Sequence, residues 1–202
     1  MQESFPAVKI APLTPENFSD LAALFEEGGD PRWCWCAYFV VRGLDWSNST
    51  PDANRALLRE RMERSPLGHP PGLVALRDGR AVGWVSLGPR EGYVRLAFSK
   101  LLAPVDERPV WSIVCFVVSR GARGQGVAAA LLAGAVEYAR AAGASTLEGY
   151  PVDTGDGRIP AANAYHGTLS MFETAGFEVV ATRRWNATTK PRIIVRRELA
   201  SG

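Results

Sequence analysis

A glycine-rich turn joins an apolar strand to an apolar helix in the second half of the chain. The strand is expected over 111–118, the turn reads Arg-Gly-Gln-Gly over 123–126, and helical spacing of apolar residues begins at Val127. The first N–H groups of a helix lack partners within the helix, and the helix dipole places partial positive charge there. Glycines let an anion approach the main chain, and Arg123 adds a permanent cation. The turn is therefore a predicted site for an anion such as a diphosphate.

Length, charge and hydropathy exclude several classes of protein. The chain has 202 residues, of which 47% are hydrophobic, which is enough for one domain with a continuous core. Its 23 basic and 21 acidic side chains nearly balance, and no dense Lys/Arg tract suggests a nucleic-acid partner. No apolar run is long enough to cross a bilayer, and the N-terminus has no signal-peptide pattern. We expect a cytoplasmic protein without nucleic-acid or membrane partners.

Three cysteines do not predict a disulfide framework, so we expect reduced thiols. Cys34 and Cys36 belong to a Trp-Cys-Trp-Cys run, and Cys115 lies in the strand before the glycine turn. A closed metal site usually needs four ligands, and neither histidine has a recognisable metal-ligand spacing. We predict no metal, and interpret the run as a buried aromatic wedge. The alternative, that the aromatic side chains of this segment wall a substrate pocket, stays open; these are Trp33, Trp35, Tyr38 and Phe39.

Periodicity and turn residues predict a single α/β domain over 1–202. Strands are predicted over 8–13, 72–77, 80–87, 111–118, 145–150, 177–185 and 192–199. Helices are predicted over 15–27, 51–64, 127–142 and 161–174. Thr14 and Thr50 are predicted helix N-caps, because a proline and an acid follow each. Asp78-Gly79 predicts a hairpin turn, and Gly88 to Arg108 is expected to be a long loop with a short apolar insertion.

The glycine turn resembles the acetyl-CoA signature of the GNAT N-acetyltransferase superfamily, Arg/Gln-x-x-Gly-x-Gly/Ala. The matching positions are Arg123, Gly126 and Ala128. The resemblance covers most of the chain, since the element order also matches and Ala-Gly-Phe over 175–177 leads into the penultimate strand. A Trp-Cys-Trp-Cys segment near the N-terminus and a Glu-Gly-Tyr-Pro segment at 148–151 further resemble a bacterial branch of that superfamily.

This resemblance implies a GNAT fold, in which a twisted, mixed and mostly antiparallel sheet of about six to seven strands is splayed at the cofactor site. About four helices would flank the sheet. Residues 111–176 would form the acetyl-CoA-binding core, and 28–70 an N-terminal aromatic and helical elaboration on the substrate side. The implied function is the direct transfer of an acetyl group from acetyl-CoA, the co-substrate, to an amine.

The resemblance also assigns the residues that bind acetyl-CoA. Backbone groups of Phe116 and Val118 would pair with the pantetheine arm, and an N–H near Phe116 or Val117 would polarise the thioester carbonyl. The turn and the first helical residues would hold the diphosphate. The predicted cofactor-binding residues are Phe116, Val117, Val118, Arg123, Gly124, Gln125, Gly126, Val127, Ala128 and Ala129.

The proton donor usual in this family is absent from its expected position. Many GNAT enzymes have a tyrosine four residues before the glycine of the Gly-Phe pair, where this chain has Phe172. A phenyl ring cannot donate a proton, so Tyr165, Ser170 or a bound water is the expected substitute. The loss also motivates an alternative function, a non-catalytic acyl-CoA-binding regulator that retained the cofactor site.

No carboxylate lies in the strand over 111–118, where some relatives have their general base. Glu148 and Tyr150 share one face of the next strand, which should border the splayed cleft. Glu148 is therefore the predicted base, directly or through water, with Asp153 as the second choice. A Glu148 that instead forms a structural salt bridge is an equally open interpretation. The catalytic candidates are thus Glu148, Tyr165 and Ser170.

A competing interpretation of the glycine turn is a dinucleotide fingerprint. Gly124-x-Gly126-x-x-Ala129 fits that pattern, and Glu148 lies at about the right distance for a ribose-binding acid. Residues 119–123 separate the strand from the glycines, however, and a hairpin precedes the strand, so we disfavour this interpretation.

The acceptor is less constrained by the sequence. Trp33, Trp35, Trp84 and Tyr93 are candidates for an aromatic wall of the acceptor pocket, with Arg90 and Glu91 as polar neighbours. A small primary amine, an amino acid derivative, an aminoglycoside-like drug and a peptide N-terminus or lysine all stay open as substrates. A homodimer is compatible with the fold.

Overall fold

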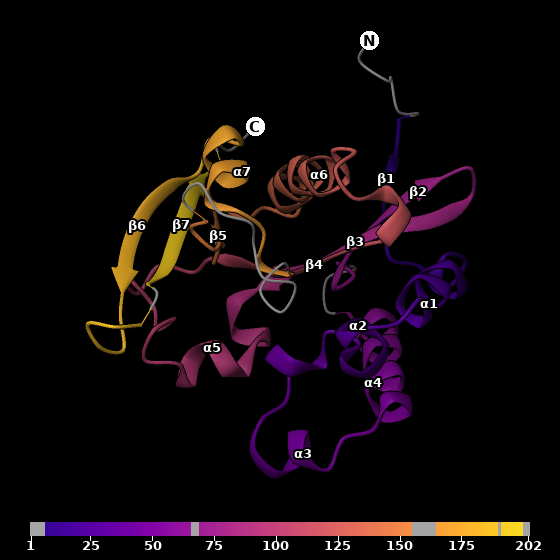
Figure 1. The fold of residues 1–202 in the computed structure, drawn as a ribbon, viewed down its shortest axis with the longest axis horizontal. Helices are drawn as coiled ribbons and strands as arrows, with labels where there is room; N and C mark the ends of the chain where they lie inside the picture. The colour runs from indigo at the N-terminus through magenta and orange to yellow at the C-terminus, as the bar shows by residue number, and fades with distance from the viewer. Residues whose placement is uncertain (1–6, 66–68, 155–164, 190, 200–202) are drawn as a thin grey trace.

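A seven-stranded mixed sheet forms the centre of the molecule (Figure 1). The computed structural model describes residues 7–65, 69–154, 165–189 and 191–199. The strand order is β1-β2-β3-β4-β5-β7-β6. The strands are β1 (Lys9–Pro12), β2 (Gly72–Arg77), β3 (Arg80–Pro89), β4 (Trp111–Val118), β5 (Thr146–Gly149), β6 (Glu178–Arg183) and β7 (Arg192–Glu198). Among these strands β4 and β5 pair in parallel and the other neighbours pair antiparallel, which confirms the predicted sheet.

Helices cover both faces of this sheet. The described α-helices are α1 (Phe18–Glu26), α2 (Asp30–Cys34), α3 (Gly43–Ser47), α4 (Pro51–Glu63), α5 (Val94–Phe98), α6 (Val127–Ala141) and α7 (Leu169–Thr174). Short 3₁₀ turns are η1 (Ala37–Phe39), η3 (Arg90–Gly92) and η4 (Arg120–Ala122). Figure 1 shows α6 and α7 on one side of the sheet, with α1, α2 and α4 on the other. No helix in the described ranges has the length and apolar content needed to cross a bilayer.

The two predicted threonine caps behave differently. Thr50 caps α4 as expected, because its hydroxyl accepts a hydrogen bond from the Ala53 N–H at 3.2 Å. At the first helix the prediction was wrong, since the Thr14 N–H instead donates to Asn17 Oδ1 at 2.9 Å. Helix α1 consequently begins at Phe18, after a turn closed by that asparagine.

Two other predicted boundaries also needed correction. The expected loop from Gly88 to Arg108 contains the end of β3, turn η3 and helix α5, which the burial of Leu96 anchors. The helix predicted over 161–174 starts outside the described residues, and its described part is shorter than expected. There α7 begins at Leu169, capped by the Thr168 hydroxyl, which accepts from the Met171 N–H at 3.1 Å.

The N-terminus of α6 lies close against β3, which positions the glycine turn. Gly83 makes this approach possible, because a Cβ at that position would lie only 2.7 Å from Val127 Cγ1. Val127 and Leu131 belong to the main apolar core, between α6 and the sheet. The start of α6 is therefore held by packing rather than by the turn alone.

Strand β4 contains a bulge at its centre. Ser86 of β3 pairs with Cys115, but the next residue of β3, Leu87, pairs with Ile113, so Val114 is an extra residue. The bulge places Ile113 and Phe116 in the core under α6, and directs Val114 and Cys115 to the opposite face. Simple alternation along the strand would instead have put Ile113 and Cys115 on one face.

Strands β4 and β5 separate after a short pairing. Their register covers Trp111 to Ile113 in β4 and ends at Gly149 in β5. Strand β4 continues to Val118, while β3 remains paired along its other edge. The splay that the family resemblance implied is therefore present, and it leaves one edge of β4 beyond Ile113 without a β5 partner.

Candidate functional site

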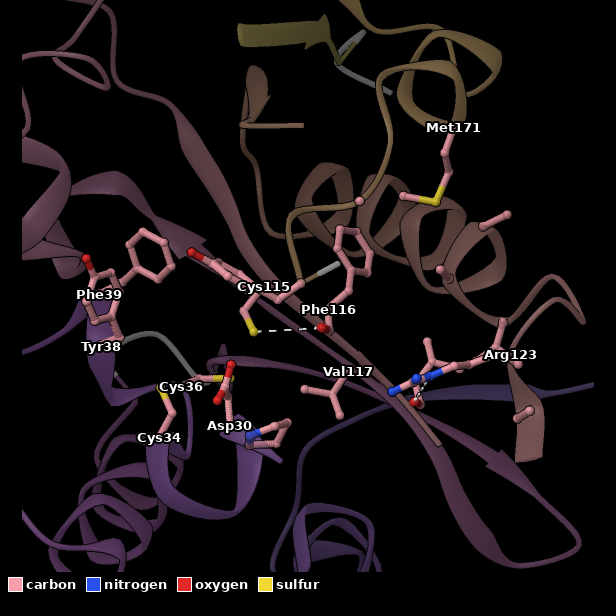
Figure 2. Close-up of a pocket in the computed structure, with 18 of the residues that line it drawn as sticks. Asp30, Cys34, Cys36, Tyr38, Phe39, Cys115, Phe116, Val117, Arg123 and Met171 are labelled. Carbon is pink, nitrogen blue, oxygen red and sulfur yellow. Dashed lines mark hydrogen bonds between the residues drawn. The ribbon is translucent and has the colours of Figure 1, made fainter. Parts of the chain in front are cut away.

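A cavity of about 910 Å³ lies beside the splayed part of β4 (Figure 2). Its walls come from four segments that are distant in sequence, within residues 30–46, 115–118, 122–129 and 165–171. The cavity therefore brings together the glycine turn, the edge of β4 and the N-terminal aromatic run. The sequence had suggested each of these segments as part of a site.

The glycine turn is open toward solvent and the cavity. Gly124 and Gly126 adopt φ angles of +74° and +77°, in the left-handed region that favours glycine. A Cβ built at either position would meet no atom within 4 Å. Gly126 is the N-cap of α6, so a bound group can approach the first N–H groups of this helix without steric hindrance.

Nine of the ten predicted cofactor-binding residues line the cavity. They are Phe116, Val117, Val118, Arg123, Gly124, Gly126, Val127, Ala128 and Ala129. Gln125 is the exception, and its side chain stabilises the turn through two hydrogen bonds instead. Its Oε1 accepts from Arg77 Nη1 at 2.6 Å, and its Nε2 donates to the Gly121 carbonyl at 2.8 Å. Arg123 is exposed in the glycine turn, and its Nε donates a hydrogen bond to the Val118 carbonyl at 3.4 Å.

Four aromatic residues of the N-terminal segment line the cavity, and they are Trp33, Tyr38, Phe39 and Trp46. Trp46 makes edge contacts with Trp33 and with Tyr38, at centroid distances of 4.8 Å and 5.2 Å. Trp33 and Tyr38 retain 40% and 38% of their exposure, so both rings are accessible from solvent. Asp30 lies in the same part of the lining. Among the residues that the structure describes, the charged side chains of the lining are Asp30 on α2, the helix that also contributes Trp33, and Arg123 at the glycine turn.

The aromatic wall predicted from the sequence was only partly correct. Trp33 lines the cavity, whereas Trp35, Trp84 and Tyr93 are almost fully buried in the core and do not line it. Tyr38 and Phe39, which the sequence had offered as a possible pocket wall, line the cavity, whereas sequence reasoning missed Trp46 and Asp30. Their only signal was proximity to the Trp-Cys-Trp-Cys run, which does not reveal which rings face a cavity.

The polar neighbours predicted for that wall also lie elsewhere. Arg90 is held against Glu148, and Glu91 is exposed on η3. Neither belongs to the lining. Cys34, Cys36 and Cys115 do line it, although no group of three or more His, Cys, Asp or Glu side chains in the described ranges is arranged to hold a metal ion.

Tyr165 is the catalytic candidate that reaches the cavity. Its side chain is half-buried, and burial is the main cause that raises its pKa to about 12. The phenol therefore keeps its proton over the ordinary assay range. Ser170 does not reach the cavity, since it is exposed and its hydroxyl lies 3.2 Å from that of Thr168. Phe172 is fully buried against Phe116, so it contributes to packing.

Glu148 is buried within an ion-pair network rather than in the cavity wall. Its Oε1 accepts hydrogen bonds from Arg90 Nη1 at 2.6 Å and from Tyr150 Oη at 2.7 Å. Its Oε2 accepts from Arg196 Nε at 2.8 Å. Both carboxylate oxygens are thus occupied, as in the salt-bridge interpretation left open above. Asp153 lies outside the lining as well.

Comparisons with known proteins agree with this architecture. A family model described as "Acetyltransferase (GNAT) family" matches residues 31–167. No curated protein matches the chain at a significant level.

Solved structures from several organisms share the fold. One is titled as the histone acetyltransferase HPA2 and related acetyltransferase from Corynebacterium glutamicum, with 19% identity, TM-score 0.55 and coverage of 96% of this chain and 98% of that chain. A Drosophila melanogaster polyamine N-acetyltransferase has 12% identity and TM-score 0.59, with coverage of 95% and 100%. The yncA acetyltransferase from Salmonella typhimurium, solved with acetyl-CoA, has 18% identity and TM-score 0.56, with coverage of 98% and 96%.

Proposed function

The chain belongs to the GNAT family of acetyltransferases, and on that premise we propose that it transfers an acetyl group from acetyl-CoA directly to an amine. The observation that carries the proposal is the continuity of the cavity. It runs from the open glycine turn at α6, along the splayed edge of β4, to a region with aromatic rings and Asp30. A nucleotide-bearing thioester and an amine can thus enter from different ends and meet beside β4.

The glycine turn fits the diphosphate of acetyl-CoA. The open positions at Gly124 and Gly126 leave the N–H groups of α6 accessible, and Arg123 supplies positive charge. Backbone groups of Phe116 to Val118 would hold the pantetheine arm, because that edge of β4 has no β5 partner. Acetyl-CoA supplies the thioester carbonyl, and an N–H near Phe116 or Val117 would stabilise the negative charge that develops on its oxygen.

The opposite end of the cavity suits an amine. Asp30 would attract a protonated amine, and Trp33 and Tyr38 would pack against its apolar part. Because Asp30 lies in the lining and Glu148 does not, we propose that Asp30 receives the amine proton, through water, before attack. Glu148 is then a structural residue that holds Arg90 and Arg196 in the buried ion-pair network. Small-molecule amines and peptide amines both stay within this proposal.

Tyr165 is the group that would assist departure of the CoA thiolate. It lies in the lining and keeps its proton, because burial raises its pKa to about 12. A thiolate of low basicity needs only weak help to leave. The absence of the usual tyrosine at Phe172 therefore leaves the reaction feasible.

The odd number of cysteines favours a reducing compartment, so we place the reaction in the cytoplasm. The homodimer stays a prediction.

Calorimetric titration with acetyl-CoA tests the proposal, using Gly126→Glu and Gly126→Ala variants. Both substitutions strain a left-handed position, at a cost of about 1–2 kcal/mol, but the glutamate also adds bulk and negative charge to the diphosphate site. We expect Gly126→Glu to lose binding and Gly126→Ala to retain most of it. A wild-type protein that does not bind acetyl-CoA would disprove the function.

An amine panel then separates the enzyme from the non-catalytic alternative. Free CoA thiol is measured as each amine is added to the acetyl-CoA complex. Release that depends on an amine supports the transferase. Tight acetyl-CoA binding without release for any amine class would favour the acyl-CoA-binding regulator.

A further inference from the structure

Two thiols from distant parts of the chain meet in the cavity wall. Cys36 lies at the start of η1, and Cys115 lies on β4 directly after the bulge. Cys36 belongs to a buried apolar cluster against which Cys115 packs, and the two thiols are close enough for each to shift the pKa of the other. Figure 2 shows both in the cavity wall, where the Cys115 thiol donates to the Phe116 carbonyl at 3.9 Å. Both line the same cavity, so a small molecule entering it can reach the pair.

Cys36 is surrounded by hydrogen-bond donors and a positive charge. The Trp84 indole can only donate, and its Nε1–H donates to Cys36 Sγ at 3.2 Å. The neighbouring Cys115 thiol and the positive charge of Arg61 also favour the charged form of this sulfur. An anionic sulfur accepts such hydrogen bonds better than a neutral thiol does. The surroundings of Cys36 therefore favour its thiolate.

The pKa values of Cys36 and Cys115 are shifted in opposite directions. The neighbouring Cys115 thiol, and to a smaller extent the hydrogen bond from Trp84 and the charge of Arg61, lower the pKa of Cys36 despite its burial. The same thiol pair, followed by burial, raises the pKa of Cys115 well above its usual value. Burial raises the pKa of Cys34 to about 12. One reactive sulfur thus has a protonated neighbour.

The backbone before Cys36 is held in an unfavourable conformation. Trp35 and Cys36 have φ angles of 46° and 56°, in the left-handed region that non-glycine residues rarely adopt. Two such residues in succession turn the chain sharply, so that Trp35 enters the core while Cys36 meets Trp84 and Cys115. Strain of this kind persists where the surrounding packing maintains it and is concentrated at functional positions.

We propose that Cys36 is a hydroperoxide-reactive thiol and that Cys115 converts its oxidised form into a disulfide. The Cys36 thiolate attacks the terminal oxygen of the hydroperoxide, an S–O bond forms, the O–O bond breaks, and the released alkoxide or hydroxide is protonated by water. The Cys36 sulfur is thereby oxidised by two electrons to a sulfenic acid. The Cys115 sulfur then attacks it, the S–S bond forms, and hydroxide leaves with the Cys115 proton as water.

The experiment uses the reduced full-length protein and hydrogen peroxide. After peroxide treatment, free thiols are blocked with N-ethylmaleimide and the protein is digested with trypsin. Cys34 and Cys36 share the peptide 33–42, and Cys115 falls in the peptide 101–120, because trypsin does not cleave before Pro109. We expect these peptides to be joined by a disulfide that dithiothreitol removes.

Single-cysteine variants identify the sulfurs. The joined peptides should persist in Cys34→Ser, the matched control, and be lost in Cys36→Ser. In Cys115→Ser, dimedone should trap the sulfenic acid at Cys36. A link through Cys34, equal oxidation of all three cysteines, or no link at all would overturn the inference.

A further measurement protects the test against misfolding. Melting temperatures establish that each variant is folded. If Cys36→Ser does not fold, the rates at which the three cysteines of the wild-type protein react with maleimide test the inference instead. Cys36 should react first. Faster labelling of Cys34 or Cys115 would contradict the inference. None of these measurements needs acetyl-CoA, so their outcome is independent of the proposed transferase function.

Discussion

Glu148 and Arg196 stand directly opposite one another on β5 and β7, and Arg196 Nε lies 2.8 Å from Glu148 Oε2. Both residues are buried, at 0% and 4% exposure. Arg90 binds the second carboxylate oxygen, and Asp106 binds Arg196 at 2.7 Å. The network joins two strands of the sheet to η3 and to the segment before β4, close to where β4 and β5 separate.

Glu148→Gln should destabilise the protein, because Arg90 loses its anionic partner and Arg196 loses one of its two. Breaking a buried ion pair typically costs about 3–5 kcal/mol of unfolding free energy. Urea unfolding measures the loss, with Glu137→Gln as the control, since the Glu137–Arg140 pair is largely exposed and should matter little. A Glu148→Gln protein of normal stability with no acetyltransferase activity would instead support the role of general base.

Arg123→Gln should weaken acetyl-CoA binding by roughly ten- to a hundredfold, the range that a lost charge-assisted hydrogen bond to phosphate usually costs. Titration at several salt concentrations should also show a smaller salt dependence than in the wild type. Arg120→Gln is the matched control, because Arg120 is exposed nearby on η4 but does not line the cavity. Equal losses in the two variants would contradict a specific role of Arg123.

Asp30→Asn should raise the KM for an amine by about tenfold or more and leave acetyl-CoA affinity unchanged. The reason is that Asp30 is the acidic side chain among the described lining residues, and it lies on α2 with Trp33 rather than at the glycine turn. Steady-state kinetics with the best amine of the panel measure the change. Asp45→Asn, an exposed position on α3 outside the lining, should behave like the wild type.

Tyr165→Phe should lower kcat by about a hundredfold, the lower end of typical contributions from general acids, with little effect on acetyl-CoA affinity. Tyr138→Phe removes a hydroxyl outside the cavity, where it donates to the Pro70 carbonyl at 3.1 Å, and should leave kcat unchanged. An unaltered kcat in Tyr165→Phe would exclude this donor. Ser170→Ala, at an exposed position, would then be tested in the same assay.

His166 should make stability depend on acid pH. Burial first, and the charge of Arg192 second, lower its pKa to about 3, whereas an unfolded histidine titrates near 6.5. Between these values the unfolded chain binds a proton that the folded chain excludes. Stability should fall by up to about 1.4 kcal/mol per pH unit as the pH drops from about 6.5 to 3, with no such effect above 6.5. His166→Asn should remove this contribution, as unfolding measured at several pH values would show; an unchanged slope would contradict it.

The strands and the glycine turn were predictable because their signals act over short stretches of chain. The strand over 111–118 was predicted with both of its boundaries correct, and the Asp78-Gly79 hairpin turn has the positive φ angles that were expected. Thr14 failed as a cap because residues 14–17 form a turn, closed by hydrogen bonds between Thr14 and Asn17, that delays the start of α1 to Phe18. Such a choice between turn and helix is decided by geometry that composition does not reveal.

The candidate site was only partly predictable. The anion site at Gly124 and Gly126 was predictable from the local sequence, because glycines before a helix start leave backbone N–H groups open to an anion in any fold. The role of Glu148 could not be judged, because its partners Arg90 and Arg196 are distant in sequence and meet it only across folded strands.

Local chemistry thus determined the order of the elements and the anion cradle, while contacts between distant segments decided which side chains share the cavity. The bulge at Val114 moved Cys115 to the face where Cys36 lies, and the strained turn at Trp35 placed Cys36 beside it. Asp30 and Arg123, distant in sequence, came to line one cavity in the same way. The physical reason is that burial and pairing depend on how whole elements pack, and no stretch of neighbouring residues contains that information.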